Sequence, residues 1–228
     1  MIWDVKQKIL GASSKAWNYP GAEFVARHNL YTFYTVVLTF GICILARGVR
    51  TPYLHSSQVD WDPERGEGTG LAVITDKDSG SGYKSRLVWL PPLVLKQMRF
   101  YELYLREMAE RTGLDPPNCK KPCYFLSPDL KVLEVRPRTI ETILRDDLPF
   151  PANWGRHLGC TVLRERGLDP EFIDAMMGHW WRGEESWGMF SSFSFATYRD
   201  QLKHILPNFL EEELFLEPIE IHYRGKTY

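Results

Sequence analysis

Apolar residues recur every three or four positions along several stretches of the chain, and this spacing is typical of amphipathic α-helices. The clearest stretch follows Pro91-Pro92 and predicts a helix to about Arg111. Its apolar positions are Leu93, Val94, Met98, Tyr101, Leu105 and Met108. Similar patterns, with start and stop signals such as Asp169-Pro170 and Gly167, predict helices over residues 22–47, 139–145, 153–166, 170–177 and 195–210.

Two short runs rich in β-forming residues, 71–75 and 86–90, flank the polar, glycine-rich segment 76–84. This pattern predicts a β-hairpin with residues 76–84 at its tip. Residues 60–70 are predicted as turn and loop, because they combine Asp, Pro and Gly. The chain is therefore predicted to be mainly α-helical with a small antiparallel β-sheet, which is an α+β fold.

Residues 30–46 form a run of 17 residues without a charge. A membrane-spanning helix needs about 20 predominantly apolar residues, and this run contains two Tyr and three Thr. A helix buried in the core fits better, and we expect the run to belong to the helix that stops at Gly48. A membrane-anchored helical protein is the alternative, and solubility without detergent would exclude it.

The composition is that of a folded protein of about one domain, with 228 residues of which 44% are hydrophobic. The 28 basic and 29 acidic residues give a net charge of −1, which excludes a protein that coats nucleic acid through bulk charge. Five of the acidic and two of the basic residues lie in 211–228, so the rest of the chain carries +2. The four cysteines are too scattered for a disulfide framework. Cys119 and Cys123 lack a partner pair for zinc, so no metal is expected.

Several residues occupy positions where chemistry is possible, although each also has an ordinary structural interpretation. Arg50 follows the helix predicted over 22–47, and Lys77 lies on the hairpin tip. Arg156 is in the first turn of a predicted helix, where the helix dipole disfavours a cation, and a residue placed against a local rule indicates function. The other candidates are Asn153, His179 in Met177-Gly178-His179, and Tyr198 in the last predicted helix.

Taken in order, these residues resemble the catalytic domain of the tyrosine recombinase, or phage integrase, family. That family carries an arginine in Gly-x-Arg after a buried helix, a lysine on a β-hairpin, a His-x-x-Arg-His segment that opens a helix, a Leu-Gly-His, and a C-terminal tyrosine. The matching positions are Arg50, Lys77, Asn153 to His157, Met177-Gly178-His179 and Tyr198. The string Lys84-Ser85-Arg86-Leu87-Val88-Trp89-Leu90-Pro91 also looks like the family's hairpin exit. The resemblance covers about residues 22–210.

The resemblance implies a site-specific recombinase or integrase that cleaves and rejoins DNA through a 3′-phosphotyrosyl intermediate, without a metal, nucleotide or other cofactor. Tyr198 would be the nucleophile. Arg50, Arg156 and His179 would bind the non-bridging oxygens of the scissile phosphate, because arginines hold phosphate oxygens bidentately. Lys77, or alternatively Lys84, would protonate the departing 5′ oxygen.

The implied partners are double-stranded DNA and further copies of the chain, in a tetramer on DNA, with no membrane. A bacterial, cytoplasmic protein of a mobile element is implied, associated with the nucleoid when bound to DNA, and the N-terminus lacks a secretory signal. The catalytic domain is expected over 21–210, after a lead over 1–20. The lead would be the remnant of a DNA-clamping domain in a longer chain; alternatively, a partner or the tail would supply the grip on DNA. The acidic tail over 211–228 is expected to dock on a neighbouring subunit or to fray.

Departures from the family pattern leave alternatives open. Asn153 replaces the first histidine, and an amide cannot act as a base, although His157 or a water can take over that role. Tyr53 stands where the family has an acidic residue that supports the first arginine. The stretch before the candidate nucleophile is long, which leaves Tyr223 and Tyr228 as weaker candidates. Two other functions stay open: a recombinase-like DNA-binding module without catalysis, and a type IB topoisomerase.

Overall fold

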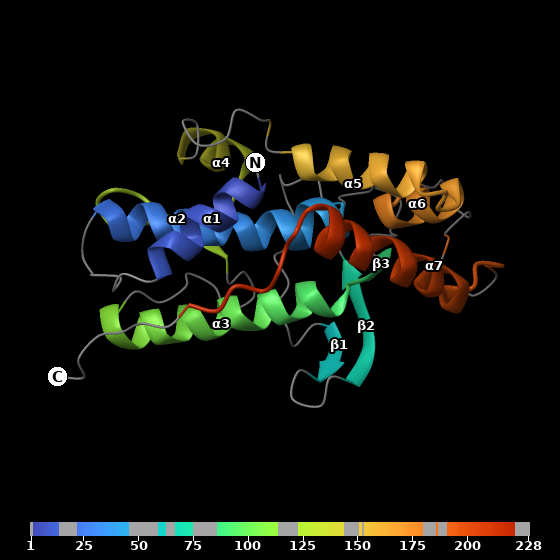
Figure 1. Cartoon of the computed structure of the whole chain (residues 1–228), viewed down its shortest axis with the longest axis horizontal. Helices are drawn as coiled ribbons and strands as arrows, with labels where there is room; N and C mark the ends of the chain where they lie inside the picture. The colour runs from blue at the N-terminus through green and yellow to red at the C-terminus, as the bar shows by residue number, and fades with distance from the viewer. Residues whose placement is uncertain are drawn as a thin grey trace, which may run out of the picture.

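Helices make up most of the fold and surround a long, buried helical segment (Figure 1). The computed structural model describes residues 2–13, 22–45, 59–62, 67–74, 86–113, 123–143, 151, 153–179, 186 and 191–221. The α-helices are α1 (Ile2–Ser13), α2 (Ala22–Val36), α3 (Pro92–Thr112), α4 (Pro137–Ile143), α5 (Trp154–Glu165), α6 (Pro170–Met177) and α7 (Phe195–Pro207), and two π-helical turns are η1 (Val37–Cys43) and η3 (Asn208–Glu213). The strands are β1 (Val59–Asp62), β2 (Glu67–Ile74), β3 (Arg86–Trp89), β4 (Tyr124–Leu126) and β5 (Val132–Glu134). This architecture confirms the predicted fold class, mainly α-helical with small antiparallel sheets.

The long buried segment consists of α2 and η1, which continues it. It holds the uncharged run of the sequence, and residues 30–38 and 42–45 are all buried. α3 lies alongside α2 (Figure 1), and the ring of Tyr31 of α2 contacts Tyr101 of α3 at a tilt and Tyr104 edge to face. The prediction of a core helix is therefore confirmed. Among the residues that the structure describes, no helix is long and apolar enough to cross a membrane.

The helical segment ends earlier than the sequence predicted. Its last helical residue is Cys43 rather than Arg47, and Leu45 has a left-handed backbone with φ of 56°. The wide π-helical winding coincides with a close crossing of η1 and α5, where a Cβ on Gly41 would lie 3.2 Å from the Cα of Gly155. The helix stops at this crossing because arginine side chains, described below, bind the carbonyl groups of Ile44 and Leu45.

β1, β2 and β3 form an antiparallel sheet in that order. The two predicted hairpin strands are confirmed as β2 and β3, but the prediction of a loop over 60–70 was wrong, because β1 and the start of β2 occupy much of it. The Thr69 hydroxyl donates to the Asp60 carboxylate at 2.5 Å, which ties the two strands together. A register shift between Asp60 and Trp61 forms a bulge that absorbs the irregular spacing of this segment.

A second antiparallel pair, β4 and β5, is attached to α2 by buried polar side chains. His28 accepts a hydrogen bond from the Tyr104 hydroxyl at Nδ1 (2.9 Å) and donates from Nε2 to the Tyr124 carbonyl (3.0 Å), since a carbonyl can only accept. Asn29 bonds the backbone of Leu126 through both its amide nitrogen (2.9 Å) and its amide oxygen (2.8 Å). These bonds satisfy the polar groups that α2 carries into the core.

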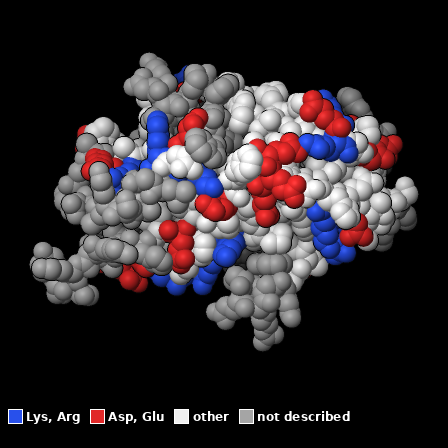
Figure 2. All heavy atoms as spheres, viewed as in Figure 1, with Lys and Arg blue, Asp and Glu red and all other residues white. Residues whose placement is uncertain are grey.

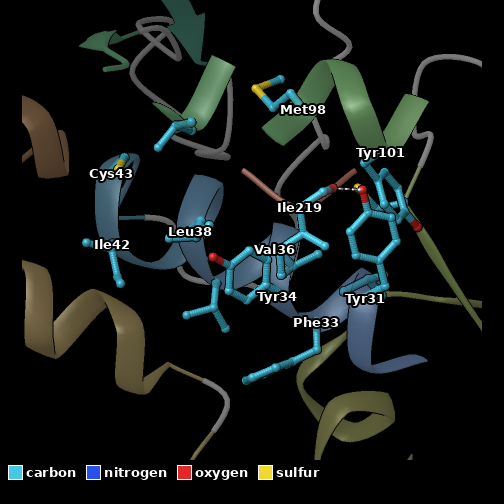
Figure 3. Packing of buried hydrophobic residues seen from close by; sticks show 14 of the residues in the cluster. Tyr31, Phe33, Tyr34, Val36, Leu38, Ile42, Cys43, Met98, Tyr101 and Ile219 are labelled. Atoms are coloured by element: carbon cyan, nitrogen blue, oxygen red, sulfur yellow. Dashed lines mark hydrogen bonds between the residues drawn. The ribbon is translucent and has the colours of Figure 1, made fainter. Parts of the chain in front are cut away.

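Residues 214–221 form a strap that crosses α2 and α3 (Figure 1). Its apolar residues Leu216, Ile219 and Ile221 are buried. The Tyr31 hydroxyl donates to the Ile219 carbonyl at 2.6 Å (Figure 3), and the Ile219 amide donates to Gln97 at 2.8 Å. The described part of the acidic tail therefore packs on its own chain rather than fraying.

The helices α5, α6 and α7 form the C-terminal part of the fold, with a smaller apolar cluster of their own. The predicted bounds of α5 and α6 and the predicted start of α7 are confirmed, whereas α7 ends at Pro207 and continues as η3 to Glu213 rather than stopping at residue 210. Asp169 caps α6 by accepting from the Glu171 amide, and Gly167 ends the turn after α5 with φ of 77°. Ser194 caps α7 by accepting from the Thr197 amide at 3.2 Å. Arg156 lies in α5 and Tyr198 in α7, while Asn153 directly precedes α5 and His179 follows the end of α6.

Candidate functional site

The structure brings together two of the predicted site residues, Arg156 and His179. Nη2 of Arg156 lies 3.3 Å from Nε2 of His179. Arginine has no acceptor, so Nε2 of the imidazole accepts this hydrogen bond. Arg156 comes from the first turn of α5, and His179 follows the left-handed Gly178 (φ 64°) that ends α6. Two separate helices therefore supply a guanidinium and an imidazole to one place.

Arg156 is also held from its other side, at the end of the long buried segment. Its side chain is buried and donates to the carbonyl oxygen of Leu45. Leu45 lies just past η1, where the last carbonyl groups of a helix have no partner within the helix and carry partial negative charge. The cation that the start of α5 disfavours is thus stabilised by the end of another helix. This contact explains why an arginine is tolerated in the first turn of α5.

His179 lies between a guanidinium and a carboxylate. With Nε2 accepting from Arg156, the proton of the neutral ring is on Nδ1, which lies 3.7 Å from Oδ1 of Asp174. The His179 side chain is 39% exposed, so it is partly accessible to solvent.

Asn153 opens α5 and is exposed. Its side chain makes no capping hydrogen bond, and its Nδ2 donates to Nε2 of His157 at 2.9 Å. His157 therefore lies within hydrogen-bonding distance of the position where the resembling family has its first histidine.

Tyr198 lies inside the C-terminal apolar cluster rather than at the surface. It is 0% exposed, and its ring centroid is 5.5 Å from those of Phe172 and Phe195. Burial raises the pKa of Tyr198, while a hydrogen bond with the backbone of Trp89 and the positive charge of Arg86 act in the opposite direction. In this conformation the side chain of Tyr198 is not accessible to an external phosphate.

Arg86 is a buried cation that sequence reasoning placed only within the hairpin exit. It is 2% exposed and donates to the carbonyl of Ile44 at 2.6 Å and to the carbonyl of Met176. A sequence signal for this burial exists, because alternate residues of a strand share a face and the apolar Val88 lies two positions on. Arg86 pairs across the sheet with Ile74, and both Ile74 and Val88 are fully buried.

The remaining predicted site residues lie outside the described part of the chain. These are Arg50 and Lys77, together with Tyr53, Lys84, Tyr223 and Tyr228. Among the described residues, no group of three or more His, Cys, Asp or Glu side chains is placed to hold a metal ion. Cys119 is also outside the described residues.

Charged side chains of both signs are mixed on the face of the molecule shown in Figure 2, where Lys and Arg are interspersed with Asp and Glu. Arg166 pairs with Glu213 across α5 and η3, and Arg136 pairs with Glu134 beside β5. This distribution agrees with the near-neutral net charge of −1.

No family model and no curated protein matches the sequence. Solved structures that are similar include the XerA recombinase, with 18% identity and a TM-score of 0.40 over 88% of this chain and 62% of that chain. The Tn1549 transposon integrase in complex with circular intermediate DNA has 13% identity and a TM-score of 0.40, over 87% of this chain and 64% of that chain. The same integrase with transposon right end DNA has 13% identity and a TM-score of 0.39, over 88% and 64%. The chain thus spans less than two thirds of the length of these structures, and TM-scores this low do not establish a family.

Proposed function

We propose that this chain is the catalytic part of a tyrosine-type DNA strand transferase, a site-specific recombinase or integrase. The observation that carries the proposal is the Arg156–His179 pair, which is 3.3 Å apart and comes from two helices. It lies at the end of the buried segment from which the chain continues to Arg50. The ordered set Arg50, Lys77, Arg156, His179 and Tyr198, which resembles the family pattern, supports it.

The pair is suited to a phosphodiester because it offers several N–H groups to one anion. A phosphate oxygen would take the place of His179 Nε2 as the acceptor for Arg156. His179 would then donate from Nε2 when both ring nitrogens are protonated, a form that Asp174 stabilises from 3.7 Å. Arg50 would bind a second non-bridging oxygen. These donors stabilise the charge that grows on the phosphate in the transition state.

The proposed reaction conserves the phosphodiester bond energy. The deprotonated Tyr198 oxygen attacks phosphorus, the bond to the 5′ oxygen breaks, and Lys77 gives that oxygen a proton. The products are a 3′-phosphotyrosyl linkage and a free 5′ hydroxyl. A 5′ hydroxyl from another strand then attacks phosphorus, releases the tyrosine, and joins the exchanged strands.

Tyr198 must leave its apolar cluster before it attacks, because its side chain is fully buried. Release of the first turn of α7 would expose the hydroxyl and also lower its pKa toward the ordinary value, since burial causes the upward shift. We therefore expect cleavage to require double-stranded DNA, and further copies of the chain, to shift α7. In this proposal, the position of α7 determines whether Tyr198 can act as the nucleophile.

The test is covalent capture on DNA. A library of nicked duplexes with randomised sequence is incubated with the protein, and duplexes that stay attached to protein after denaturation are recovered and sequenced. We expect adducts from the wild type and from Tyr223→Phe, which is the matched control, but none from Tyr198→Phe. Arg156→Ala should reduce adduct formation by about 100-fold or more. Adducts that survive Tyr198→Phe would exclude the proposed nucleophile.

A catalytically impaired DNA-binding module is the second candidate, favoured by the burial of Tyr198 and by Asn153 in place of a histidine. Sequence-specific binding without adducts from any variant would support it. Relaxation of supercoiled plasmid without site preference would instead indicate a type IB topoisomerase.

A further inference from the structure

Arg86 is an arginine in the interior, and a buried charge requires strong compensation. Its side chain enters the core from β3, whose register places it opposite Ile74 of β2. Only 2% of Arg86 is exposed. The contacts that compensate its burial therefore indicate what it holds together.

The two carbonyl groups that Arg86 binds belong to the ends of two different helices. Ile44 follows η1 and is 42 residues from Arg86 in sequence, whereas Met176 is in the last turn of α6 and is 90 residues away. The last carbonyls of a helix lack intrahelical donors and carry partial negative charge, so one guanidinium satisfies both ends. Arg86 thus joins β3, η1 and α6 at one point.

Arg156 repeats this contact on the neighbouring residue. It binds the carbonyl of Leu45, while Arg86 binds that of Ile44. Leu45 has a left-handed backbone (φ 56°), a conformation that a leucine adopts only when its surroundings impose it. Two buried arginines therefore hold consecutive carbonyls of one strained segment.

Both segments held by Arg86 lead directly into proposed site residues. His179 follows Met176 by three positions, and Arg50 follows Ile44 by six. We propose that Arg86 is a positioning residue, whose contacts with Ile44 and Met176 set the placement of Leu45, the residue that binds Arg156, relative to His179. This role rests on the proposed strand-transfer function, because Arg86 acts through those residues and touches no substrate.

Two substitutions at Arg86 and one control test the proposal. Arg86→Met keeps an apolar stem of similar length and removes every donor, whereas Arg86→Lys keeps the charge but places a single, more strongly hydrated nitrogen on a flexible stem. Gln97→Met is the matched control, because Gln97 is also buried and bonded, to Thr35 and to Ile219, but lies in the α2–α3 part of the core. All four proteins are compared at a temperature where circular dichroism shows them to be folded.

The first readout is hydrogen exchange, which does not depend on DNA chemistry. We expect Arg86→Met to raise amide exchange selectively in peptides that contain residues 42–45 and 173–179, and Gln97→Met to leave these peptides unchanged. The second readout is single-turnover cleavage of the captured DNA site. We expect Arg86→Met to slow cleavage by about 100-fold, the effect of a misplacement of about 1 Å, with DNA affinity within about threefold of wild type. Arg86→Lys should recover part of this loss and carries the test if Arg86→Met does not fold.

The outcomes separate the two proposals. The positioning role is supported if Arg86→Met exchanges faster only in the peptides that contain residues 42–45 and 173–179 and also cleaves DNA more slowly. The positioning role is overturned if amide exchange in Arg86→Met rises equally in all peptides, or if folded Arg86→Met cleaves DNA at the wild-type rate. Either result leaves the strand-transfer function intact. A wild-type protein that forms no adduct overturns the strand-transfer function and the positioning role with it, while the exchange data still report whether Arg86 holds the two helix ends.

Discussion

His28 carries its imidazole into the core between the Tyr104 hydroxyl and the Tyr124 carbonyl. The ring fits these two partners in its neutral form, with one nitrogen accepting and the other donating. Burial lowers the pKa of His28 from 6.5 to about 4, and the hydrogen bond to Tyr124 opposes this only in part. The stability that His28 contributes is therefore complete above the pKa of the unfolded chain and is lost as the pH falls toward the folded value.

We expect the free energy of unfolding to fall between pH 6.5 and pH 4, because in that range the unfolded chain binds a proton that the folded chain does not. The loss should be up to about 3 kcal/mol larger than in His28→Gln. Urea unfolding at a series of pH values measures both. The exposed His204 provides a matched control, since His204→Gln should keep the wild-type slope. If the free energy of unfolding of His28→Gln depended on pH as steeply as that of the wild type, the pH dependence would not be due to His28.

Asn153 is the residue at which the proposed site departs most from the family pattern. An amide donates and accepts hydrogen bonds but does not take up a proton, whereas an imidazole does. We expect Asn153→His to raise the single-turnover cleavage rate by roughly tenfold or more, because a positioned general base accelerates proton transfer. Thr161→His, at an exposed position of α5, should leave the rate unchanged. An unchanged rate in Asn153→His would indicate that His157 already provides the base.

The crossing of η1 and α5 depends on small residues from both elements. Gly41 and Gly155 face each other, and a Cβ on Gly159 would lie 2.6 Å from the Ile42 carbonyl oxygen and 2.6 Å from Cδ2 of Leu45. The backbones therefore approach closely enough for Arg156 to reach Leu45. The geometry of the candidate site is thus a consequence of this helix packing.

At this crossing, Gly159→Ala should destabilise the protein, although alanine is normally better than glycine in a helix by about 1 kcal/mol. The added methyl group must displace the backbone of η1, and we expect a loss of about 2 kcal/mol in the free energy of unfolding. Thr161→Ala, exposed on the same helix, should change it by less than about 0.5 kcal/mol. Urea unfolding compares the two, and equal stabilities would show that the crossing can relax.

Elements with a clear period were predicted well from the sequence. α3 shows the three-to-four residue spacing along its whole length, and α6 has both a capping Asp169 and a stop at Gly178. β1 was missed because its residues, rich in Asp, read as a loop, and only the pairing with β2 makes them a strand. The end of η1 was misplaced because arginines distant in sequence bind the carbonyls of Ile44 and Leu45, which directly follow it.

The candidate site could be predicted only where it depends on local sequence patterns, and not where it depends on contacts between distant residues. The sequence order suggested Arg156 and His179, and the structure places them in contact. The burial of Tyr198 depends on rings from α6 and α7 that meet only in the folded chain, so no local pattern indicates it. The role of Arg86 was hidden because the hairpin around it reads as an ordinary charged turn.

At the scale of the whole molecule, the strap over 214–221 joins the two ends of the described chain. The Lys6 ammonium donates to the Phe215 carbonyl at 2.8 Å and pairs with Glu217 at 3.0 Å. The Tyr34 hydroxyl donates to the Glu217 carbonyl at 2.8 Å. α1, α2 and the C-terminal strap are thus held as one unit.

We expect Ile219→Ala in the strap to lower the free energy of unfolding by about 3 kcal/mol, since it removes a buried side chain from between α2 and α3. Phe215→Ala is the internal control, because the Phe215 side chain is 64% exposed and should cost little. Thermal or urea unfolding measures the difference. Equal effects would mean that the strap is held by its backbone bonds alone.

The Lys6–Phe215 contact joins residues 209 positions apart, and the strap is synthesised after every element it contacts. Until the strap is synthesised, the tyrosine hydroxyls of α2 that bind it stay hydrated, and the apolar surface between α2 and α3 remains uncovered. Closing so long a loop is entropically costly, which makes attachment of the strap a late step of folding. The nascent chain thus carries an exposed apolar surface until the strap is synthesised, and such a surface favours aggregation and the binding of chaperones.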